Sequence, residues 1–196
     1  LPLYHIFCLT VNLMIFTKIG AHNILVTNPR DIPALVKEIA KYRVTVITAV
    51  NTLFNALVNN ADFAHVDFSN LKIAVGGGMA VQKAVADKWK AVTGIPIVEA
   101  YGLTEASPGV TINPINITAY TGSIGLPIPG TEIEIRDDAG KEVAVGQPGE
   151  LWIKGPQVMK GYWQRPDVTA KALDPRCLLA SGDVPVFHEN GWVELV

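Results

Sequence analysis

The run Tyr101-Gly102-Leu103-Thr104-Glu105 contains the side chains best suited to chemistry. It follows an apolar, strand-like segment, and open parallel sheets bind their ligands at the carboxyl ends of strands. The Thr104 hydroxyl can bind a phosphate or carboxylate oxygen, and the Glu105 carboxylate suits a hard cation such as Mg²⁺. The Tyr101 ring can stack on a planar base. These residues predict a ligand site, although an ordinary turn at a strand end has similar residue types.

Two other runs are candidates for binding. Gly76-Gly77-Gly78-Met79 separates a strand pattern from a helix pattern, and glycines let the backbone approach a flat ligand closely. Its spacing is neither that of a dinucleotide-binding loop nor that of a Walker loop, and a plain glycine turn also accounts for it. In Ser181-Gly182-Asp183, the carboxylate suits a vicinal diol such as ribose, which donates two hydroxyl protons. A solvated turn aspartate is the alternative.

His5 is the remaining candidate, and it stands inside the apolar stretch Leu3–Ile19. A hydrogen-bonded core histidine is the usual role in such surroundings. The stretch is interrupted by polar residues and has neither the length of a membrane span nor the features of a signal peptide. We therefore interpret it as a buried core helix with a functional N-terminal end.

The elements that must position these residues change character along the chain. In the first half, apolar residues recur at helical spacing after Asp31, after Asn51 and after Gly78. We expect Asp31 and Asn51 to be the N-caps of their helices. Between these helices, short apolar runs predict strands at Val44–Ile47, Leu71–Val75 and Ile97–Ala100. This β-α-β-α-β order predicts an α/β fold, with a parallel sheet and flanking helices.

The second half is rich in glycine and proline and has no long amphipathic helix. Short apolar runs predict strands at Glu132–Arg136, Glu150–Lys154 and Trp192–Val196, and Asp138-Ala139-Gly140 resembles a hairpin turn. We therefore expect a small antiparallel β-subdomain after the parallel sheet. The change in composition predicts an α/β subdomain over residues 1–115 and a β-rich subdomain over residues 116–196.

The composition excludes several classes of protein. The 196 residues include 16 Lys and Arg against 18 Asp and Glu, so the chain has no global basic field for nucleic acid. With 49% hydrophobic residues it is too apolar to be disordered. Only 17% of the residues are charged, which suggests surfaces that face missing neighbours. Because the chain starts at Leu1 instead of Met, we expect a piece of a longer protein.

The two cysteines, Cys8 and Cys177, lack the spacing of a metal or redox site. We expect both to be buried free thiols in a reducing cytosol.

Taken together and in order, the motifs are more specific than any one of them. The set comprises Leu1-Pro2-Leu3-Tyr4-His5, the Gly76–Met79 and Tyr101–Glu105 runs, Gly149-Glu150-Leu151 with Lys154-Gly155 and Gly161-Tyr162-Trp163, and Ser181-Gly182-Asp183. It resembles the adenylate-forming (AMP-binding) superfamily across essentially the whole chain. Within that superfamily, residues 1–7, 27–31 and 155–159 are most similar to bacterial long-chain fatty-acid–CoA ligases.

The resemblance implies an enzyme that activates a fatty acid with ATP and Mg²⁺, forms an acyl-adenylate and pyrophosphate, and then transfers the acyl group to coenzyme A with release of AMP. Position by position, it implies an adenine frame, an α-phosphate contact at Thr104, a Mg²⁺ ligand at Glu105, a ribose contact at Asp183 and an acyl carboxylate near His5. The residues of the adenine frame are Gly77, Gly78 and Tyr101, with Met79 and Gly102 in the same nucleotide-binding set. An apolar tunnel between the first helix and the strand ending near Ala49 would take the acyl chain.

The chain departs from the family pattern at three places. Ser181 stands where the family usually has Thr, Cys177-Leu178 replaces a Gly-Trp pair, and an acidic residue is common in the family near His188. The family's phosphate loop would precede Leu1, and its hinge and lysine-bearing C-terminal domain would follow Val196. We therefore expect this piece to be inactive by itself.

Two alternatives stay open at this stage. One is a ligase for an aryl or short-chain acid; an amino-acid substrate is disfavoured because Asn55 and Asn59 stand where a carboxylate would be needed. The other is a non-catalytic nucleotide- or lipid-binding module. The resemblance implies a cytoplasmic protein, leaves peripheral contact with the inner membrane and a homodimer open, and gives no role to nucleic acid.

Overall fold

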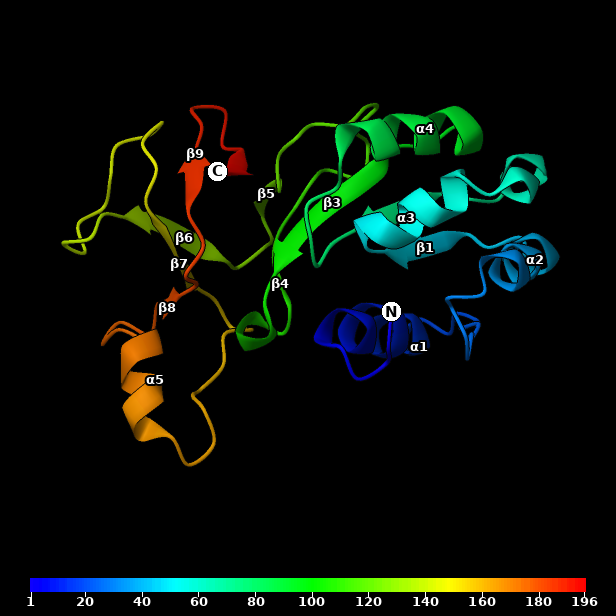
Figure 1. Cartoon of the computed structure of the whole chain (residues 1–196). Coiled ribbons are helices and arrows are strands. Elements are labelled where there is room, and N and C mark those ends of the chain that lie inside the picture. Colours follow the sequence, from blue (N-terminus) through cyan, green and yellow to red (C-terminus); the bar gives the residue numbers. More distant parts are fainter. The chain divides into compact units, whose positions relative to one another are not determined.

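The computed structural model describes all 196 residues, which form two compact units (Figure 1). The first consists of Leu1–Glu99 and Pro114–Gly122, and the second of Ala100–Asn113 and Ser123–Val196. The chain passes from the first unit to the second within strand β3 (Ile97–Gly102).

This division differs from the single boundary expected after residue 115. Residues 100–113 belong to the second unit because β4 (Gly109–Ile112) pairs antiparallel with the end of β3 and with β5 (Leu126–Pro127). Residues 114–122 belong to the first because Tyr120 packs against its core and donates its hydroxyl to the carbonyl of Val81 at 3.0 Å.

The first unit has the expected parallel sheet. Strand β1 (Val46–Ala49) pairs in parallel with β2 (Ile73–Gly76), which pairs in parallel with the first half of β3. Helix α2 (Ile32–Tyr42) precedes β1 in the sequence. Helix α3 (Asn51–Val58) and the short 3₁₀ helix η2 (Ala61–His65) lie between β1 and β2, and α4 (Lys83–Thr93) lies between β2 and β3. The predicted α/β class is confirmed.

The first turn of α2 is capped by a local side chain, whereas the first residue of α3 makes a tertiary contact. Asp31 caps α2 as predicted, because its Oδ1 accepts a hydrogen bond from the backbone N–H of Ala34 at 3.0 Å. Asn51 was expected to cap its own helix, which is wrong. Its Oδ1 accepts from the backbone N–H of Gln82 at 2.9 Å, so it joins the start of α3 to the residue that precedes α4.

Three aromatic rings form the centre of the first unit's core. Trp89 of α4 lies 4.8 Å from Phe54 of α3 and 5.5 Å from Phe63 of η2, measured between ring centroids. All three side chains are fully buried. Their packing joins α3, η2 and α4, and the edge-to-face contact of Phe54 with Trp89 adds to the free energy gained by burial.

The N-terminal stretch is helical but not a buried core helix. It forms a π-helix, η1 (Cys8–Ile15), followed by one turn of α-helix, α1 (Phe16–Lys18). Only Phe7 and Cys8 are buried, while Tyr4, Met14 and Ile19 are exposed, so the expected burial is wrong. The physical reason is that no segment of the chain covers the outer face of this helix. No helix in the structure combines the length and the apolar character that crossing a bilayer requires.

The second unit is antiparallel, as predicted. Strand β6 (Glu132–Arg136) pairs with β7 (Glu150–Lys154), and β7 pairs with β8 (Leu179–Ala180). Strands β9 (Pro185–Phe187) and β10 (Val193–Leu195) form a separate hairpin. One short helix that the sequence did not indicate, α5 (Pro166–Ala172), precedes β8 (Figure 1). The core of this unit consists of small and branched apolar residues: Ala106, Val110, Leu151, Ile153 and Leu179.

The cysteines differ from each other. Both are free, and Cys8 is buried as expected, but Cys177 is exposed. Cys177 also has a left-handed backbone with φ of 62°. The family pattern has glycine where this chain has Cys177. Glycine suits the left-handed conformation, because a Cβ atom is disfavoured there.

Candidate functional site

The candidate residues are divided between the two units. The second unit contains Tyr101, Gly102, Thr104, Glu105 and Asp183, and the first contains His5, Gly77, Gly78 and Met79. Tyr101 and Gly102 belong to strand β3 itself, whereas the sequence placed them just after it. Gly102 has a structural reason of its own: a Cβ atom there would lie 1.9 Å from the carbonyl oxygen of Pro108.

Tyr101 and Asp183 are brought together although 82 residues separate them. The Tyr101 hydroxyl donates a hydrogen bond to Oδ2 of Asp183 at 2.6 Å. Burial raises the pKa of the Tyr101 phenol far above its ordinary value, and the Asp183 carboxylate raises it further. The phenol therefore stays protonated and acts as a donor.

Several hydrogen bonds fix the backbone of the Ser181-Gly182-Asp183 turn, and three of them involve Gly182 and Asp183. The Asp183 N–H donates to Oγ of Ser181 at 3.1 Å, so the serine retains the hydroxyl function of the family's threonine. The Gly182 N–H donates to Oε1 of Glu150 at 3.2 Å, and the Asp183 carbonyl accepts from the N–H of Leu151 at 2.9 Å. Strand β7 thus holds the turn from one side.

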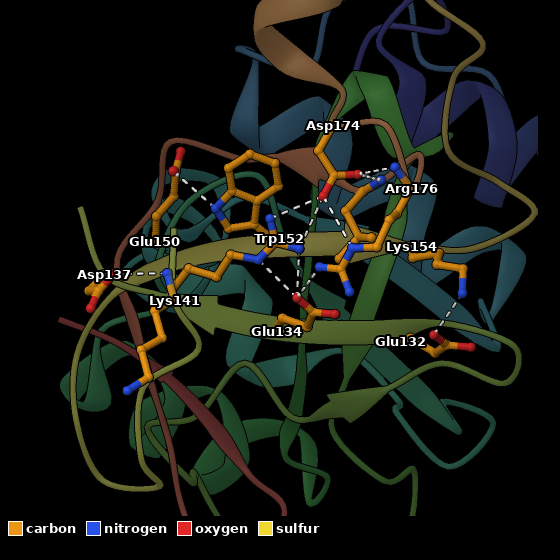
Figure 2. A network of polar contacts seen from close by, with 11 residues as sticks. Glu132, Glu134, Asp137, Lys141, Glu150, Trp152, Lys154, Asp174 and Arg176 are labelled. Atoms are coloured by element: carbon orange, nitrogen blue, oxygen red, sulfur yellow. Dashed lines mark hydrogen bonds and ion pairs between the residues drawn. The ribbon is translucent and has the colours of Figure 1, made fainter. Parts of the chain in front are cut away.

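Glu150 belongs to a larger polar network on β6 and β7 (Figure 2). Its second oxygen, Oε2, accepts from the indole N–H of Trp152 at 3.1 Å. The guanidinium of Arg136 lies over the Trp152 ring, 4.3 Å from its centroid. Arg136 is buried and donates to Glu134 at 2.6 and 2.8 Å and to Asp174 at 3.1 and 3.2 Å.

The same network fixes the loop that leads to the turn. Oδ1 of Asp174 accepts from the backbone N–H groups of Arg176 and Leu178, just before β8. Burial raises the pKa of the Asp174 carboxyl, but those N–H groups and the Arg136 guanidinium outweigh burial, and the net pKa is lowered. For Glu134, burial is likewise outweighed by Arg136 and Arg176, and its pKa is lowered too.

Glu105 is held by a tyrosine that sequence reasoning left without a role. It lies in the 3₁₀ turn η3 (Thr104–Ala106), and its Oε1 accepts from the Tyr162 hydroxyl at 2.8 Å. Its carbonyl accepts from the backbone N–H of Met159 at 2.8 Å. The hydrogen bond from the phenol to Glu105 raises the pKa of Tyr162. The Gly161-Tyr162-Trp163 motif was the only signal in the sequence.

The chemistry of Glu105 suits a hard divalent cation as one ligand among several. Its carboxylate is half-exposed, and the neighbouring Thr104 is exposed. The chain has no group of three or more His, Cys, Asp or Glu side chains that would enclose a metal by themselves. A Mg²⁺ ion fits such a position when phosphate oxygens and waters complete its shell, which is its usual mode with nucleotides.

The glycine run of the first unit has structural reasons at two positions. A Cβ atom on Gly76 would lie 2.6 Å from Val81 and 2.8 Å from Ile97, so packing excludes a side chain there. Gly78 has φ of +78°. The N–H of Gly77 donates to the carbonyl of Ala49 at 3.3 Å, and Met79 is exposed. These contacts suit a plain turn and a ligand loop equally.

His5 is exposed, so the alternative of a core histidine is wrong. Its Nδ1 accepts a hydrogen bond from the backbone N–H of Phe7 at 3.3 Å, at the beginning of the N-terminal helix. Near it in sequence, Asn12 accepts from the Thr48 hydroxyl of β1 at 2.9 Å. A polar contact thus joins the two elements between which an apolar tunnel was expected.

Glu99 is a buried carboxyl that the sequence did not single out. Burial raises its pKa from 4.5 to about 7, against the opposing effect of hydrogen bonds from the Gly122 backbone, the Thr121 side chain and the Val81 backbone. Its Oε2 has no partner. The group therefore joins β3 to residues 121–122 and to the start of the α4 region at the cost of an incompletely bonded oxygen.

The fold and the motifs together define the class of protein. The model of the AMP-binding enzyme family matches residues 1–163, and the chain belongs to that family.

Within this family, the chain is similar to acid–CoA ligases. The chain is 57% identical to a long-chain-fatty-acid–CoA ligase of Yersinia pestis over 196 residues, which is all of this chain and 35% of that protein. The crystal structure of the anthranilate CoA ligase AuaEII with anthranoyl-AMP matches 98% of this chain and 37% of that one, with a TM-score of 0.91 and 25% identity. ATP-bound MatB from Rhodopseudomonas palustris matches 100% of this chain and 38% of that one, with a TM-score of 0.85 and 27% identity. The chain thus spans little more than a third of each.

Proposed function

We propose that this chain is the central part of a long-chain fatty-acid–CoA ligase. The observation that carries the proposal is the 57% identity to the Yersinia pestis ligase along the entire chain. The whole protein would condense a fatty acid with ATP to an acyl-adenylate and pyrophosphate, and coenzyme A would then displace AMP. Cytoplasmic location, with peripheral contact at the inner membrane, belongs to the same proposal, because the substrate is a lipid.

Residues of the second unit would bind the sugar and phosphates of ATP. Asp183 would accept the ribose hydroxyl protons, and Thr104 would donate to the α-phosphate. Glu105, held by the Tyr162 hydroxyl, would provide a carboxylate ligand to Mg²⁺. When bound, Mg²⁺ neutralises charge on the phosphates during nucleotidyl transfer. The support for these roles is the match of each residue to its family motif.

Residues of the first unit would bind the base and the acid. The backbone of Gly77 and Gly78, with Met79, would lie against the adenine. His5 would lie near the acyl carboxylate, and its exposed imidazole at the beginning of a helix supports this role.

The acid is tested with the whole protein encoded by the reading frame that contains this chain. Acid-dependent exchange of pyrophosphate into ATP is measured with palmitate, octanoate and anthranilate. Long-chain ligation predicts the highest kcat/KM for palmitate. The similarity to an anthranilate ligase makes an aryl acid the main alternative, and a preference for anthranilate would establish it.

The isolated 196-residue chain separates catalysis from binding. We expect less than about 1% of the exchange rate of the whole protein. The family's phosphate loop and its C-terminal lysine would stabilise charge on the phosphates, and each such group contributes roughly 100-fold or more to the rate. If the whole protein binds ATP but shows no pyrophosphate exchange with any of the three acids, it is instead a nucleotide-binding module.

A charge-specific variant tests Glu105. Glu105→Gln retains an oxygen that can accept from Tyr162 but loses the negative charge. We expect exchange to fall about 100-fold with an unchanged melting temperature, because a half-exposed carboxylate contributes little to stability. Activity within twofold of wild type would remove Glu105 from the metal site.

A further inference from the structure

We propose that Tyr101 is a positioning residue for the ribose contact: its hydroxyl holds the Asp183 carboxylate in the orientation that accepts both ribose hydroxyl protons. The inference rests on the proposed function and adds to it, because the family resemblance gives Tyr101 a role only through its ring. The 2.6 Å hydrogen bond from the phenol to Oδ2 of Asp183 carries it.

The carboxylate retains enough acceptor capacity for both partners. Each oxygen of an ionised Asp183 can accept two hydrogen bonds, and the phenol uses one of these on Oδ2. The remaining lone pairs on Oδ1 and Oδ2 can accept the 2′ and 3′ hydroxyl protons. Because Asp183 is exposed, its side chain would rotate freely without a partner, and the phenol removes that freedom.

The direction of the hydrogen bond matters. Burial and the neighbouring carboxylate raise the pKa of the Tyr101 phenol, so it stays protonated and its single proton is donated to Asp183. The phenol therefore acts on the carboxylate as a fixed donor.

The two sides of the contact are fixed by different elements. Tyr101 pairs with Thr111 in the antiparallel ladder of β3 and β4, and it packs against the apolar core of the second unit. The turn that contains Asp183 is held through its backbone by Glu150 and Leu151 of β7. A donor on a strand and an acceptor on an anchored turn form a preorganised pair.

The test is Tyr101→Phe in the whole protein, because phenylalanine retains the aromatic ring and removes only the hydroxyl. We measure KM for ATP and for 2′-deoxy-ATP, kcat, and the affinity for both nucleotides by calorimetry. Loss of one charge-assisted hydrogen bond predicts a KM for ATP about 5- to 10-fold higher, with kcat within twofold. The preference for ATP over 2′-deoxy-ATP should fall toward that of Asp183→Ala.

A double variant distinguishes positioning from general stability. If Tyr101 acts through Asp183, Tyr101→Phe added to Asp183→Ala raises the KM for ATP no further. The matched control is Tyr42→Phe, which removes a phenol hydroxyl from the first unit and should leave the preference for ATP unchanged.

Two results would overturn the inference: an unchanged preference for ATP over 2′-deoxy-ATP in Tyr101→Phe, or full additivity with Asp183→Ala. A whole protein that activates no fatty acid but binds ATP contradicts the proposed function alone, because calorimetry still measures the preference for the ribose hydroxyl. A protein that binds no ATP overturns both.

Discussion

The two units differ in the interactions that fix their candidate binding groups. In the first, parallel strands and amphipathic helices enclose fully buried rings, and its candidate binding groups are mostly backbone atoms of a glycine run. In the second, polar side chains join distant segments: Tyr101 to Asp183, Glu105 to Tyr162, and Arg136 to Asp174. Apolar burial is non-directional and tolerates small shifts, whereas hydrogen bonds require fixed geometry. The second unit is therefore better suited to orient side chains toward a ligand.

The largest expected effect tests the apolar half of this comparison. Trp89→Ala removes the central ring of the first unit and should lower the free energy of unfolding by about 4 kcal/mol, from lost burial plus the cavity left behind. Amide hydrogen exchange followed by mass spectrometry should show lost protection in β1, β2 and α4. Trp163, which is 88% exposed, provides the control: Trp163→Ala should change stability by less than about 0.5 kcal/mol.

The next effect tests the polar half. Arg136→Ala leaves the carboxylates of Glu134 and Asp174 without their buried cation and should cost about 3–4 kcal/mol. Protection from exchange should be lost in β6, β7 and β8. The control is Arg165→Ala, because the ion pair of Arg165 with Asp167 is exposed and should contribute almost nothing. Equal costs for both variants would mean that the network does not support this unit.

The third prediction concerns pH, and the two units should respond with opposite signs. Glu99 has a raised pKa, so the folded state retains a proton that the unfolded state loses, and stability falls as the pH rises from 4.5 through about 7. We expect a loss on the order of 3 kcal/mol over that window in the first unit.

In the second unit, Glu134 and Asp174 have lowered pKa values. Their contribution is fully present above the pKa values of the unfolded chain, near 4, and is lost as the pH falls through their folded values. Urea unfolding between pH 3 and pH 8, with exchange measured separately for each unit, would check both signs. Glu99→Gln should flatten the profile of the first unit alone, and a slope that persists in this variant would assign it to another group.

The smallest effect tests a single backbone position. Cys177→Gly should stabilise the protein by about 1 kcal/mol, because glycine adopts the left-handed conformation at φ of 62° without strain. Cys177→Ala retains a Cβ atom and should give no gain. The measurement is the midpoint of urea unfolding for both variants, and equal midpoints would show that the position is unstrained.

The periodic apolar residues were sufficient to predict the parallel sheet and the helices α2, α3 and α4, because the sequence spacing of a helix or strand is also its spatial period. The residue type of Asp31 was sufficient to predict its cap. Frequent glycine and proline between short apolar runs were sufficient to predict the antiparallel second half. Where the chain departs from expectation, contacts between distant residues decide. Asn51 bonds to the residue before α4 instead of capping its own helix, and β4 pairs with β3 and so belongs to the second unit.

The sequence alone therefore determined the family, the order of elements and the residue types available for binding a nucleotide. The tertiary structure decided which of those side chains meet: the phenol of Tyr101 reaches Asp183 across 82 residues, and Tyr162 reaches Glu105 across 57. It also decided that Glu99 is buried with a raised pKa and that the N-terminal helix is exposed. The physical reason is that hydrogen bonding and burial depend on distances in space, which spacing along the chain specifies only within one element.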